Sequence, residues 1–400
     1  MLDALIIGGG VSGLAAARLM RARGLAVEVW EGKAEPGGWA RSESWGDGIL
    51  EPGAQVLFRA PGSALDRLLL ELDLSVEPLL GKRWMTMGDR AHELPGRSTQ
   101  WMSSPLLSPI SRLRVGWGLM RTPPFKPGAT LQAVARARFG RTFTQDLLPG
   151  LTAGLFAAPP ELLAGTLLPV LVGRASGTLV RPVGGMGSFV GALARNLPIQ
   201  LNRPVRQLEL LPEGGVRCVG EEGTLISRKV VLALPAPAAA ELLEPFVPKA
   251  AEALRAIRFL DLRFRHSRHA ACEQLSDGWG LLCDPGREAG LLGFTCLPGP
   301  GNTIQLRCGM GGAYPIGKAL RAGDGLEQRL RTWFPTLGPA LEERETIADK
   351  AMPLPEPGHG IRVEGVLKHL PGSISWVGAG RFPGGIPGIL SGLEQWLSEV

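Results

Sequence analysis

Glycines near the start of the chain have the spacing of a turn that holds a dinucleotide. The segment reads Gly8-Gly9-Gly10-Val11-Ser12-Gly13, which is G-x-G-x-x-G. In such a turn the first glycine makes a tight bend, the second lets the backbone approach a pyrophosphate, and the third lets a helix lie close to a strand. Free N–H groups at the positive end of that helix then bind the phosphates. The sequence therefore predicts a dinucleotide site.

An acid follows at the distance expected for ribose recognition. Glu31 stands eighteen residues after Gly13, where a carboxylate accepts hydrogen bonds from ribose hydroxyls. A negative charge there disfavours a 2′-phosphate, so we do not expect NADP. The neighbouring elements agree: an apolar strand over Leu5–Ile7, a helix from Leu14 to about Arg23, and a strand over Ala26–Trp30. A glycine-rich turn without a ligand is the alternative, and it does not explain these elements.

Other residues that could carry chemistry are sparse. His266, His269 and Cys272 resemble a metal site in spacing, but three such ligands need a fourth partner or an open position. Arginines interleave with them, at Arg263, Arg265 and Arg268. The chain has only five histidines and one tyrosine, and it shows no catalytic-triad motif. We therefore expect no metal and no catalytic acid or base, so that a cofactor has to supply the difficult step.

Length and cysteine use limit the class of protein. A chain of 400 residues is too long for one ordinary core, so two or three subdomains are expected. Its five cysteines form no C-x-x-C pair, and their odd number argues against a disulfide framework and for a reducing compartment. The chain begins directly with the strand pattern, without a basic leader, and no uncharged apolar run reaches the length of a membrane span. We expect a cytoplasmic protein.

The net charge of +6 is unevenly distributed along the chain. Between Leu94 and Leu208 thirteen lysines and arginines accompany two acids, so this block carries +11. A block this basic favours an anionic partner, such as a membrane surface, nucleic acid or a polycarboxylate substrate, unless its arginines are simply solvated. Its large apolar side chains suit a surface that inserts into a bilayer; they include Trp101, Met102, Trp117 and Met120. We predict either a peripheral membrane surface or a buried helical cap here, and no nucleic-acid partner.

After Glu31 the chain resembles the flavin amine oxidase superfamily. A second glycine pair with a basic residue follows, reading Gly37-Gly38-Trp39-Ala40-Arg41-Ser42. The superfamily returns to its cofactor domain through a segment that here spans 184–235. It closes the cofactor site with a C-terminal strand and turn, here 375–380 and 384–392, before a helix that reaches Trp396. The resemblance implies bound FAD, with further contacts from Gly32, Gly38, Trp39, Val205, Ala379, Gly384, Gly385 and Ile386.

Within the superfamily the chain resembles the protoporphyrinogen oxidases. Leu50-Glu51-Pro52-Gly53 leads into the loop that contacts the cofactor in that family, formed here by Gly53, Ala54, Gln55 and Val56. Arg83 stands twelve residues before Pro95, the position from which that family binds a substrate propionate. A helix, a turn and a helix are expected between Phe139 and Pro169. The resemblance implies a tetrapyrrole substrate, FAD as the hydride acceptor, and dioxygen as the final electron acceptor.

The sequence departs from that family at several positions. The loop after Gly53 lacks the expected Pro-Arg pair, so the role of that arginine is missing or is taken by Arg59. The turn after Phe156 lacks Gly-Asp, and the region 251–347 offers no matching pocket residues. An amine oxidase, for which Trp376 and the single tyrosine are weak candidates for an aromatic pair, or a carotenoid desaturase is the alternative enzyme. A flavin-binding assembly protein without activity is a third interpretation.

The predicted fold is α/β, with a doubly wound FAD-binding domain, an α+β substrate domain and a mostly helical membrane-associating region. Residues 1–56, 181–240 and 348–400 are assigned to the FAD-binding domain, 57–93 and 241–347 to the substrate domain, and 94–180 to the helical region. The predicted function is oxidation of protoporphyrinogen IX or coproporphyrinogen III in haem biosynthesis, in the cytoplasm or on the inner face of the cell membrane. The sequence does not choose between these substrates or set the oligomeric state.

Overall fold

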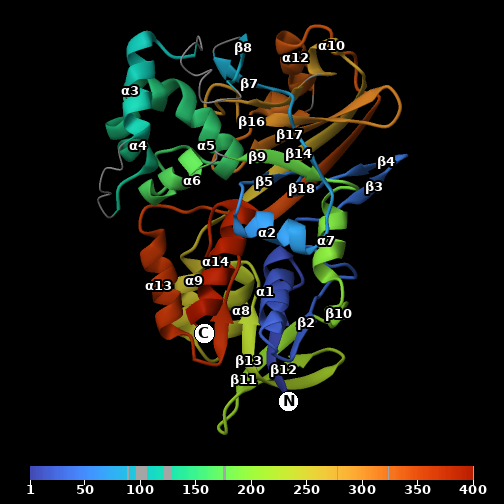
Figure 1. Ribbon diagram of the computed structural model, residues 1–400, viewed down its shortest axis with the longest axis vertical. Helices are drawn as coiled ribbons and strands as arrows, with labels where there is room; N and C mark the ends of the chain where they lie inside the picture. Colours follow the sequence, from blue (N-terminus) through green and yellow to red (C-terminus); the bar gives the residue numbers. More distant parts are fainter. Residues whose placement is uncertain are drawn as a thin grey trace.

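The computed structural model describes residues 1–87, 90–95, 106–120, 128–173, 177–276, 278–322 and 324–399. Two seven-stranded sheets dominate the described part, one in the lower half of Figure 1 and one in the upper half. Both marked chain ends lie in the lower half. The lower sheet therefore belongs to the part of the molecule that contains the N-terminal glycine turn.

The lower sheet is built from segments that are far apart in the sequence. Its strands are β1 (Leu2–Ile7), β2 (Val27–Trp30), β10 (Ile199–Gln200), β11 (Val205–Leu210), β12 (Val216–Gly220), β13 (Gly223–Leu232) and β19 (Ile374–Trp376). Their order is β10-β2-β1-β13-β12-β11, and β19 also pairs with β13. Strands β10, β2, β1, β13 and β19 pair in parallel, whereas β11, β12 and the start of β13 form an antiparallel meander. The sheet is therefore mixed, with a parallel centre.

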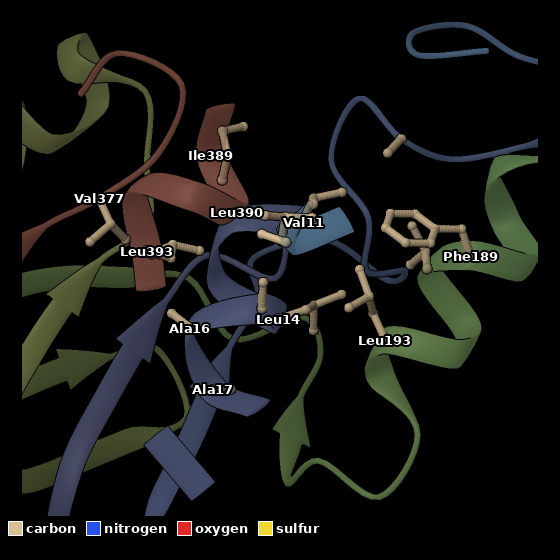
Figure 2. Packing of buried hydrophobic residues seen from close by; sticks show 14 of the residues in the cluster. Val11, Leu14, Ala16, Ala17, Phe189, Leu193, Val377, Ile389, Leu390 and Leu393 are labelled. Carbon is tan, nitrogen blue, oxygen red and sulfur yellow. The ribbon is translucent and has the colours of Figure 1, made fainter. Parts of the chain in front are cut away.

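Helices cover both faces of this sheet, because successive side chains of a strand point in opposite directions. On β1, Ala4 and Ile6 pack into one core, and Leu5 and Ile7 pack into another. The first core is covered by α1 (Val11–Ala22), α7 (Met186–Ala194) and α14 (Gly385–Glu399), and the second by α8 (Ala236–Leu243), α9 (Pro248–Arg255) and α13 (His359–His369). Figure 2 shows the first core, where the apolar side chains of α1 meet those of α7 and α14.

Further helices and two small sheets surround the upper sheet or connect it to the lower one. The helices are α2 (Ala64–Glu71), α3 (Pro109–Leu119), α4 (Leu131–Phe139), α5 (Leu148–Phe156), α6 (Leu168–Gly173), α10 (Glu273–Ser276), α11 (Lys318–Ala322) and α12 (Asp324–Trp333). A π-helical turn (Phe143–Leu147) joins α4 to α5, and a 3-10 turn (Gly165–Leu167) precedes α6. One small sheet pairs β3 (Glu43–Trp45) with β4 (Gly48–Leu50), and the other has the order β5 (Leu57–Arg59), β9 (Thr178–Pro182), β6 (Val76–Pro78).

The upper sheet separates two more cores. Its strands are β7 (Lys82–Met87), β8 (Arg90–Glu93), β14 (Phe259–Ala270), β15 (Gly278–Leu282), β16 (Leu291–Pro298), β17 (Thr303–Gly311) and β18 (Glu342–Pro353), in the order β18-β14-β17-β16-β15-β7-β8. One face packs Met85 and Phe264 against the helices α4, α5 and α6. The other face packs Leu306 and Cys308 against α12. We call the first of these the helical-region face.

The predicted α/β class is confirmed, and both sheets are mixed. The division into six chain segments stays a prediction. No helix among the described residues is both long enough and apolar enough to cross a membrane. Trp101 and Met102, which the sequence places on a bilayer-inserting surface, lie outside the described residues.

The last helix begins earlier than the sequence predicts. The run 384–392 reads as a turn because it is rich in glycine and contains Pro387, yet α14 already starts at Gly385. A proline is tolerated in the first turn of a helix, where its missing N–H would have no intrahelical acceptor. Gly388 and Gly392, one helical turn apart, leave room for the preceding Phe382–Pro383, which a methyl group at either glycine would overlap. The glycines therefore serve close packing.

Gly13→Ala is expected to destabilise the protein, because the added methyl group would overlap the carbonyl oxygen of Gly8. Forcing extra volume into a packed site costs roughly 1–3 kcal/mol. Gly191→Ala is the matched control, since a methyl group on this glycine of α7 meets no atom within 4 Å. Thermal unfolding of the two variants measures the difference. Equal melting temperatures would show that α1 can move away from β1 at little cost.

Candidate functional site

The N-terminus of α1 has the features of a phosphate-binding site. Gly8 adopts a positive φ of 106°, which completes the tight bend after β1. A Cβ on Gly10 would meet no atom within 4 Å, so there is open space beside this residue. The helix has no side-chain cap and no acid in its first turn. Its first N–H groups and the positive end of its dipole are thus available to a pyrophosphate, and a side chain at Gly10 would occupy the space that such a ligand needs.

Glu31 lies directly beside this turn. Its Oε2 accepts a hydrogen bond of 2.6 Å from the Gly9 N–H, and its Oε1 accepts one of 2.9 Å from the Lys33 N–H. Each carboxylate oxygen keeps a further lone pair, so both can still accept a ribose hydroxyl. The carbonyl oxygen of Glu31 accepts the N–H of Arg203, two residues before Val205 begins β11. Gly32 lies against Pro204 of the same segment. Glu31, Gly32 and Val205 therefore form one end of the candidate site.

The second glycine pair packs directly on the first. The N–H of Gly37 donates to the carbonyl of Gly9 at 2.8 Å, and a Cβ on Gly38 would lie 3.5 Å from the Cα of Gly10. Trp39 follows, half-buried, with the Arg41 guanidinium 5.7 Å from its ring centroid. This arrangement brings Gly38 and Trp39 beside the open space at Gly10.

The C-terminal segment reaches the same turn from the other end of the chain. The N–H of Val377 donates to Leu232 at the end of β13, and a Cβ on Gly378 would lie 3.5 Å from the Ser12 hydroxyl. Ala379 packs on the core that contains α1. Gly385 and Ile386 form the start of α14, and a Cβ on the preceding Gly384 would lie 3.4 Å from Val170 of α6. The structure therefore places these C-terminal residues between α1 and the helical region.

The loop Gly53–Val56 links the glycine turn to the upper sheet. A side chain on Gly53 would overlap the carbonyl oxygen of Trp39, and the N–H of Ala54 donates to that same oxygen at 2.8 Å. Gln55 is buried, and its Oε1 accepts hydrogen bonds from Thr295 and, at 3.4 Å, from Arg307. Val56 is half-buried at the end of the loop. The predicted cofactor loop therefore touches β16 and β17 through one side chain.

Glu51 clamps this loop to α7, a role that the sequence analysis missed. Its buried carboxylate accepts the Met186 N–H at 2.9 Å and the Ser42 hydroxyl at 3.0 Å, and that hydroxyl accepts the Gly187 N–H. Burial raises the pKa of Glu51, and the hydrogen bond from Met186 opposes that shift. The motif Leu50-Glu51-Pro52-Gly53 could have indicated this role, because it places an acid directly before the predicted cofactor loop.

Arg83 lies on the upper sheet, away from the glycine turn. It is half-buried in β7, two residues before Met85 and on the same face of the strand. Met85 packs into the core under α5, so Arg83 also belongs to the helical-region face. Burial lowers the pKa of its guanidinium. Arg59 does not replace the arginine missing from the loop, because it forms an ion pair with Asp66 at 2.5 Å.

The His-His-Cys spacing does not make a metal site in the described part of the chain. His269 forms hydrogen bonds through both ring nitrogens, to the Gly338 carbonyl at 3.0 Å and to Ser267 at 2.8 Å. The Cys272 thiol contacts the Thr336 hydroxyl. Burial, helped by the positive charges of two arginines, lowers the pKa of His266 to about 3. Both ring nitrogens of His269 and the thiol of Cys272 are therefore engaged with neighbouring groups of the protein.

Gly10→Val is expected to abolish cofactor binding while leaving the fold intact. A Cβ at this position meets no protein atom within 4 Å, so the valine side chain would extend into the open space at the start of α1. Gly191→Val, at an equally open position of α7, is the control and should keep its cofactor. The yellow absorbance of purified protein, followed by release of FAD rather than FMN on denaturation, measures the effect. A Gly10→Val protein with full FAD content would contradict this placement of the pyrophosphate.

Comparison with known proteins agrees with this geometry. A model of the flavin containing amine oxidoreductases matches residues 11–263. Protoporphyrinogen oxidase of Bos taurus is 25% identical over 343 residues, which are 72% of this chain and 72% of that protein. A candidate protoporphyrinogen oxidase from Exiguobacterium sp. 255-15 has a TM-score of 0.77 at 17% identity, over 99% of this chain and 98% of that one. Cyclohexylamine oxidase from Brevibacterium oxydans IH-35A has a TM-score of 0.72 at 19% identity, over 99% of each chain.

The two structural neighbours share the fold of this chain and carry different names, so they do not distinguish between substrates. The family match, in contrast, covers more than half of the chain and includes the helix that follows the glycine turn. The open space at Gly10 and the carboxylate of Glu31 suit the pyrophosphate and ribose of FAD. The chain belongs to the flavin containing amine oxidoreductase family and is an FAD-dependent oxidoreductase.

Proposed function

We propose that the protein oxidises a porphyrinogen, either protoporphyrinogen IX or coproporphyrinogen III, to the porphyrin in haem biosynthesis. Arg83 carries this proposal, because its half-buried guanidinium lies on the helical-region face of the upper sheet. Burial lowers the pKa of this group, and a substrate carboxylate could form two parallel charge-assisted hydrogen bonds with its guanidinium. The identity to the bovine protoporphyrinogen oxidase supports the same substrate class.

The residues around the glycine turn are proposed to hold the cofactor. FAD bound there would supply a hydride acceptor for the substrate, with dioxygen as the final electron acceptor and hydrogen peroxide as the second product. The turn binds the pyrophosphate, Glu31 accepts the ribose hydroxyls, and the loop Gly53–Val56 contacts the flavin end. The proposed contacts are Gly8, Gly9, Gly10, Val11, Ser12, Gly13, Glu31, Gly32, Gly38, Trp39, Gly53, Ala54, Gln55, Val56, Val205, Ala379, Gly384, Gly385 and Ile386.

The upper sheet is suited to a substrate that needs to be held rather than protonated. His266 lies in the sheet, but with a pKa of about 3 it stays neutral at physiological pH and is a weak base. Burial also raises the pKa of Tyr314, which therefore stays protonated. Formation of the aromatic macrocycle drives each porphyrinogen oxidation step, so binding and orientation are the main tasks of the protein.

An amine or a carotenoid fits the site less well. Trp376 lies in the core of the lower sheet, where its Nε1 donates to the Leu234 carbonyl, whereas Tyr314 packs in the core under α5. These two side chains therefore do not form the aromatic pair of an amine oxidase. The positive charge of Arg83 repels an ammonium group and has no counterpart on a hydrocarbon chain. Membership of an oxidoreductase family also supports an enzyme over an inactive assembly protein.

Arg83→Ala is expected to raise the KM for a porphyrinogen without changing the FAD content. A partly desolvated charge-assisted pair is worth roughly 1.5–3 kcal/mol, so kcat/KM should fall about ten- to a hundredfold. Arg83→Lys should recover part of the loss, because an ammonium group does not form two parallel bonds. Lys82→Ala, at the exposed neighbouring position, is the control. Porphyrin fluorescence during turnover measures these values, and an unchanged KM in Arg83→Ala would contradict the assignment.

We also propose that α3 contacts a membrane surface on the cytoplasmic side. Three apolar side chains of α3 and that of Met120, which caps its C-terminus, have 55–80% of their surface exposed, and their spacing places them in one stripe: Ile110, Leu113, Trp117 and Met120. The opposite side of the helix is anchored, because Gly118 packs against Phe139 of α4. Arg112 and Arg114 lie on the same helix, within the +11 block. Apolar insertion combined with arginines at the headgroups suits an anionic bilayer.

Replacing Ile110 and Leu113 together by serine is expected to weaken binding to anionic vesicles roughly tenfold or more, because each removes exposed apolar area that would be buried in the bilayer. Ile361→Ser, at a 70% exposed position of α13, is the control. Salt approaching molar concentration, where the screening length falls to about 3 Å, should weaken binding of the unmodified protein. Vesicle sedimentation measures all three. Equal binding to neutral and anionic vesicles, or by the double variant, would contradict the proposal.

A further inference from the structure

A single row of residues crosses six strands of the upper sheet. Strand pairing places Arg83 opposite Gly280, Gly280 opposite Thr295, and Thr295 opposite Arg307. Arg307 is in turn opposite His266, which is opposite Arg344. Residues that are directly opposite in neighbouring strands share a face. Arg83 and Arg307 therefore lie in one row on one face, three strand spacings or about 14 Å apart.

This row lies on the helical-region face. Thr295 and Arg307 both donate hydrogen bonds to Gln55 in the proposed cofactor loop. The Arg307 guanidinium also lies 3.7 Å from the ring centroid of Phe264, which packs in the core under the helices. A substrate held beside the loop Gly53–Val56 would therefore meet this face of the sheet.

The positive charge of Arg307 is only partly balanced by neighbouring groups. Its Nε is sealed from solvent and has no acceptor among the described residues, and its hydrogen bond to Gln55 is long, at 3.4 Å. Burial lowers its pKa to about 9, so the group still carries its charge at physiological pH. The negative charge of Glu51 attracts the Arg307 guanidinium, but the hydrogen bonds that this carboxylate accepts come from Ser42 and Met186. A half-buried guanidinium with one weak neutral hydrogen-bond partner gains most from a carboxylate.

Arg344, at the far end of the row, is already neutralised. It forms an ion pair with Glu43 at 2.6 Å. Arg307, in contrast, forms no ion pair with any of the described residues, although its guanidinium lies deeper in the sheet. Of these two arginines in one row, Arg344 has a carboxylate partner within the protein and Arg307 has none among the described residues. Arg307 is therefore the one that is suited to bind an external anion.

We propose that Arg307 binds a second carboxylate of the substrate, on the edge of the macrocycle opposite the carboxylate bound by Arg83. This inference rests on the proposed function. Protoporphyrinogen carries its two propionates on adjacent rings, so both lie on one edge. Coproporphyrinogen carries a propionate on every ring and presents carboxylates to both arginines. The row therefore favours the four-carboxylate porphyrinogen as the substrate.

Equilibrium binding of the two oxidised macrocycles to the FAD-loaded protein tests this proposal without relying on turnover. Arg307→Gln is expected to weaken binding of coproporphyrin III about ten- to a hundredfold and that of protoporphyrin IX less than threefold. Arg307→Lys should retain part of the coproporphyrin affinity, and it also gives a result where the glutamine variant does not fold. Arg263→Gln is the control, because Arg263 lies on the opposite face of β14 and pairs with Glu345. Porphyrin fluorescence titration and FAD content are measured for each variant.

The outcomes separate the two proposals. Equal losses for both porphyrins, or no loss for either, in an Arg307→Gln protein with normal FAD content would overturn the role of Arg307 and leave the proposed function standing. An unmodified protein that binds neither porphyrin and oxidises neither porphyrinogen would overturn the proposed function, and this inference with it.

Discussion

The site depends on backbone segments that approach each other more closely than side chains would allow. Gly13 lies against the carbonyl of Gly8, Gly37 donates to Gly9, and Gly53 lies against the carbonyl of Trp39. These contacts form one continuous series from the end of β1 to the cofactor loop. A methyl group at Gly13 or Gly53 would separate the two partners, so the series fixes the distance between the phosphate end of the site and the upper sheet.

The two sheets differ in the side chains that they carry. The lower sheet is apolar on both faces, and its two cores hold the glycine turn and the C-terminal segment in place. The upper sheet contains two partly desolvated cations, Arg83 and Arg307. Burial disfavours the charged form of each guanidinium and therefore lowers its pKa. Partly desolvated charges lower the stability of a sheet, and we propose that these two bind carboxylates of the substrate. The buried carboxylate of Glu51 joins the two parts, because it fixes the loop that Arg307 contacts.

The sequence predicts the lower sheet and its cofactor well, because the strand, glycine turn, helix and Glu31 are neighbours along the chain. Its resemblance to the protoporphyrinogen oxidases also points to Arg83, twelve residues before Pro95, and the role of this residue stays a prediction. The sequence does not predict Arg307, because the row that places this residue relative to Arg83 depends on pairing among four separate strands, whose register no local pattern sets. The start of α14 is missed for a different reason: glycines that serve packing against Phe382 look like turn residues in the sequence.

Anaerobic mixing of the FAD-loaded protein with each porphyrinogen tests the central claim most directly, since it observes the cofactor and the substrate in one reaction without an external acceptor. Loss of the oxidised flavin absorbance is the predicted result, and it should be faster with coproporphyrinogen III than with protoporphyrinogen IX. Because the porphyrin forms only after six electrons are removed and one FAD accepts two, porphyrin fluorescence should appear after dioxygen is admitted. Flavin that stays oxidised with both porphyrinogens, and is reduced by a primary amine instead, would contradict the assignment of a porphyrinogen as the substrate.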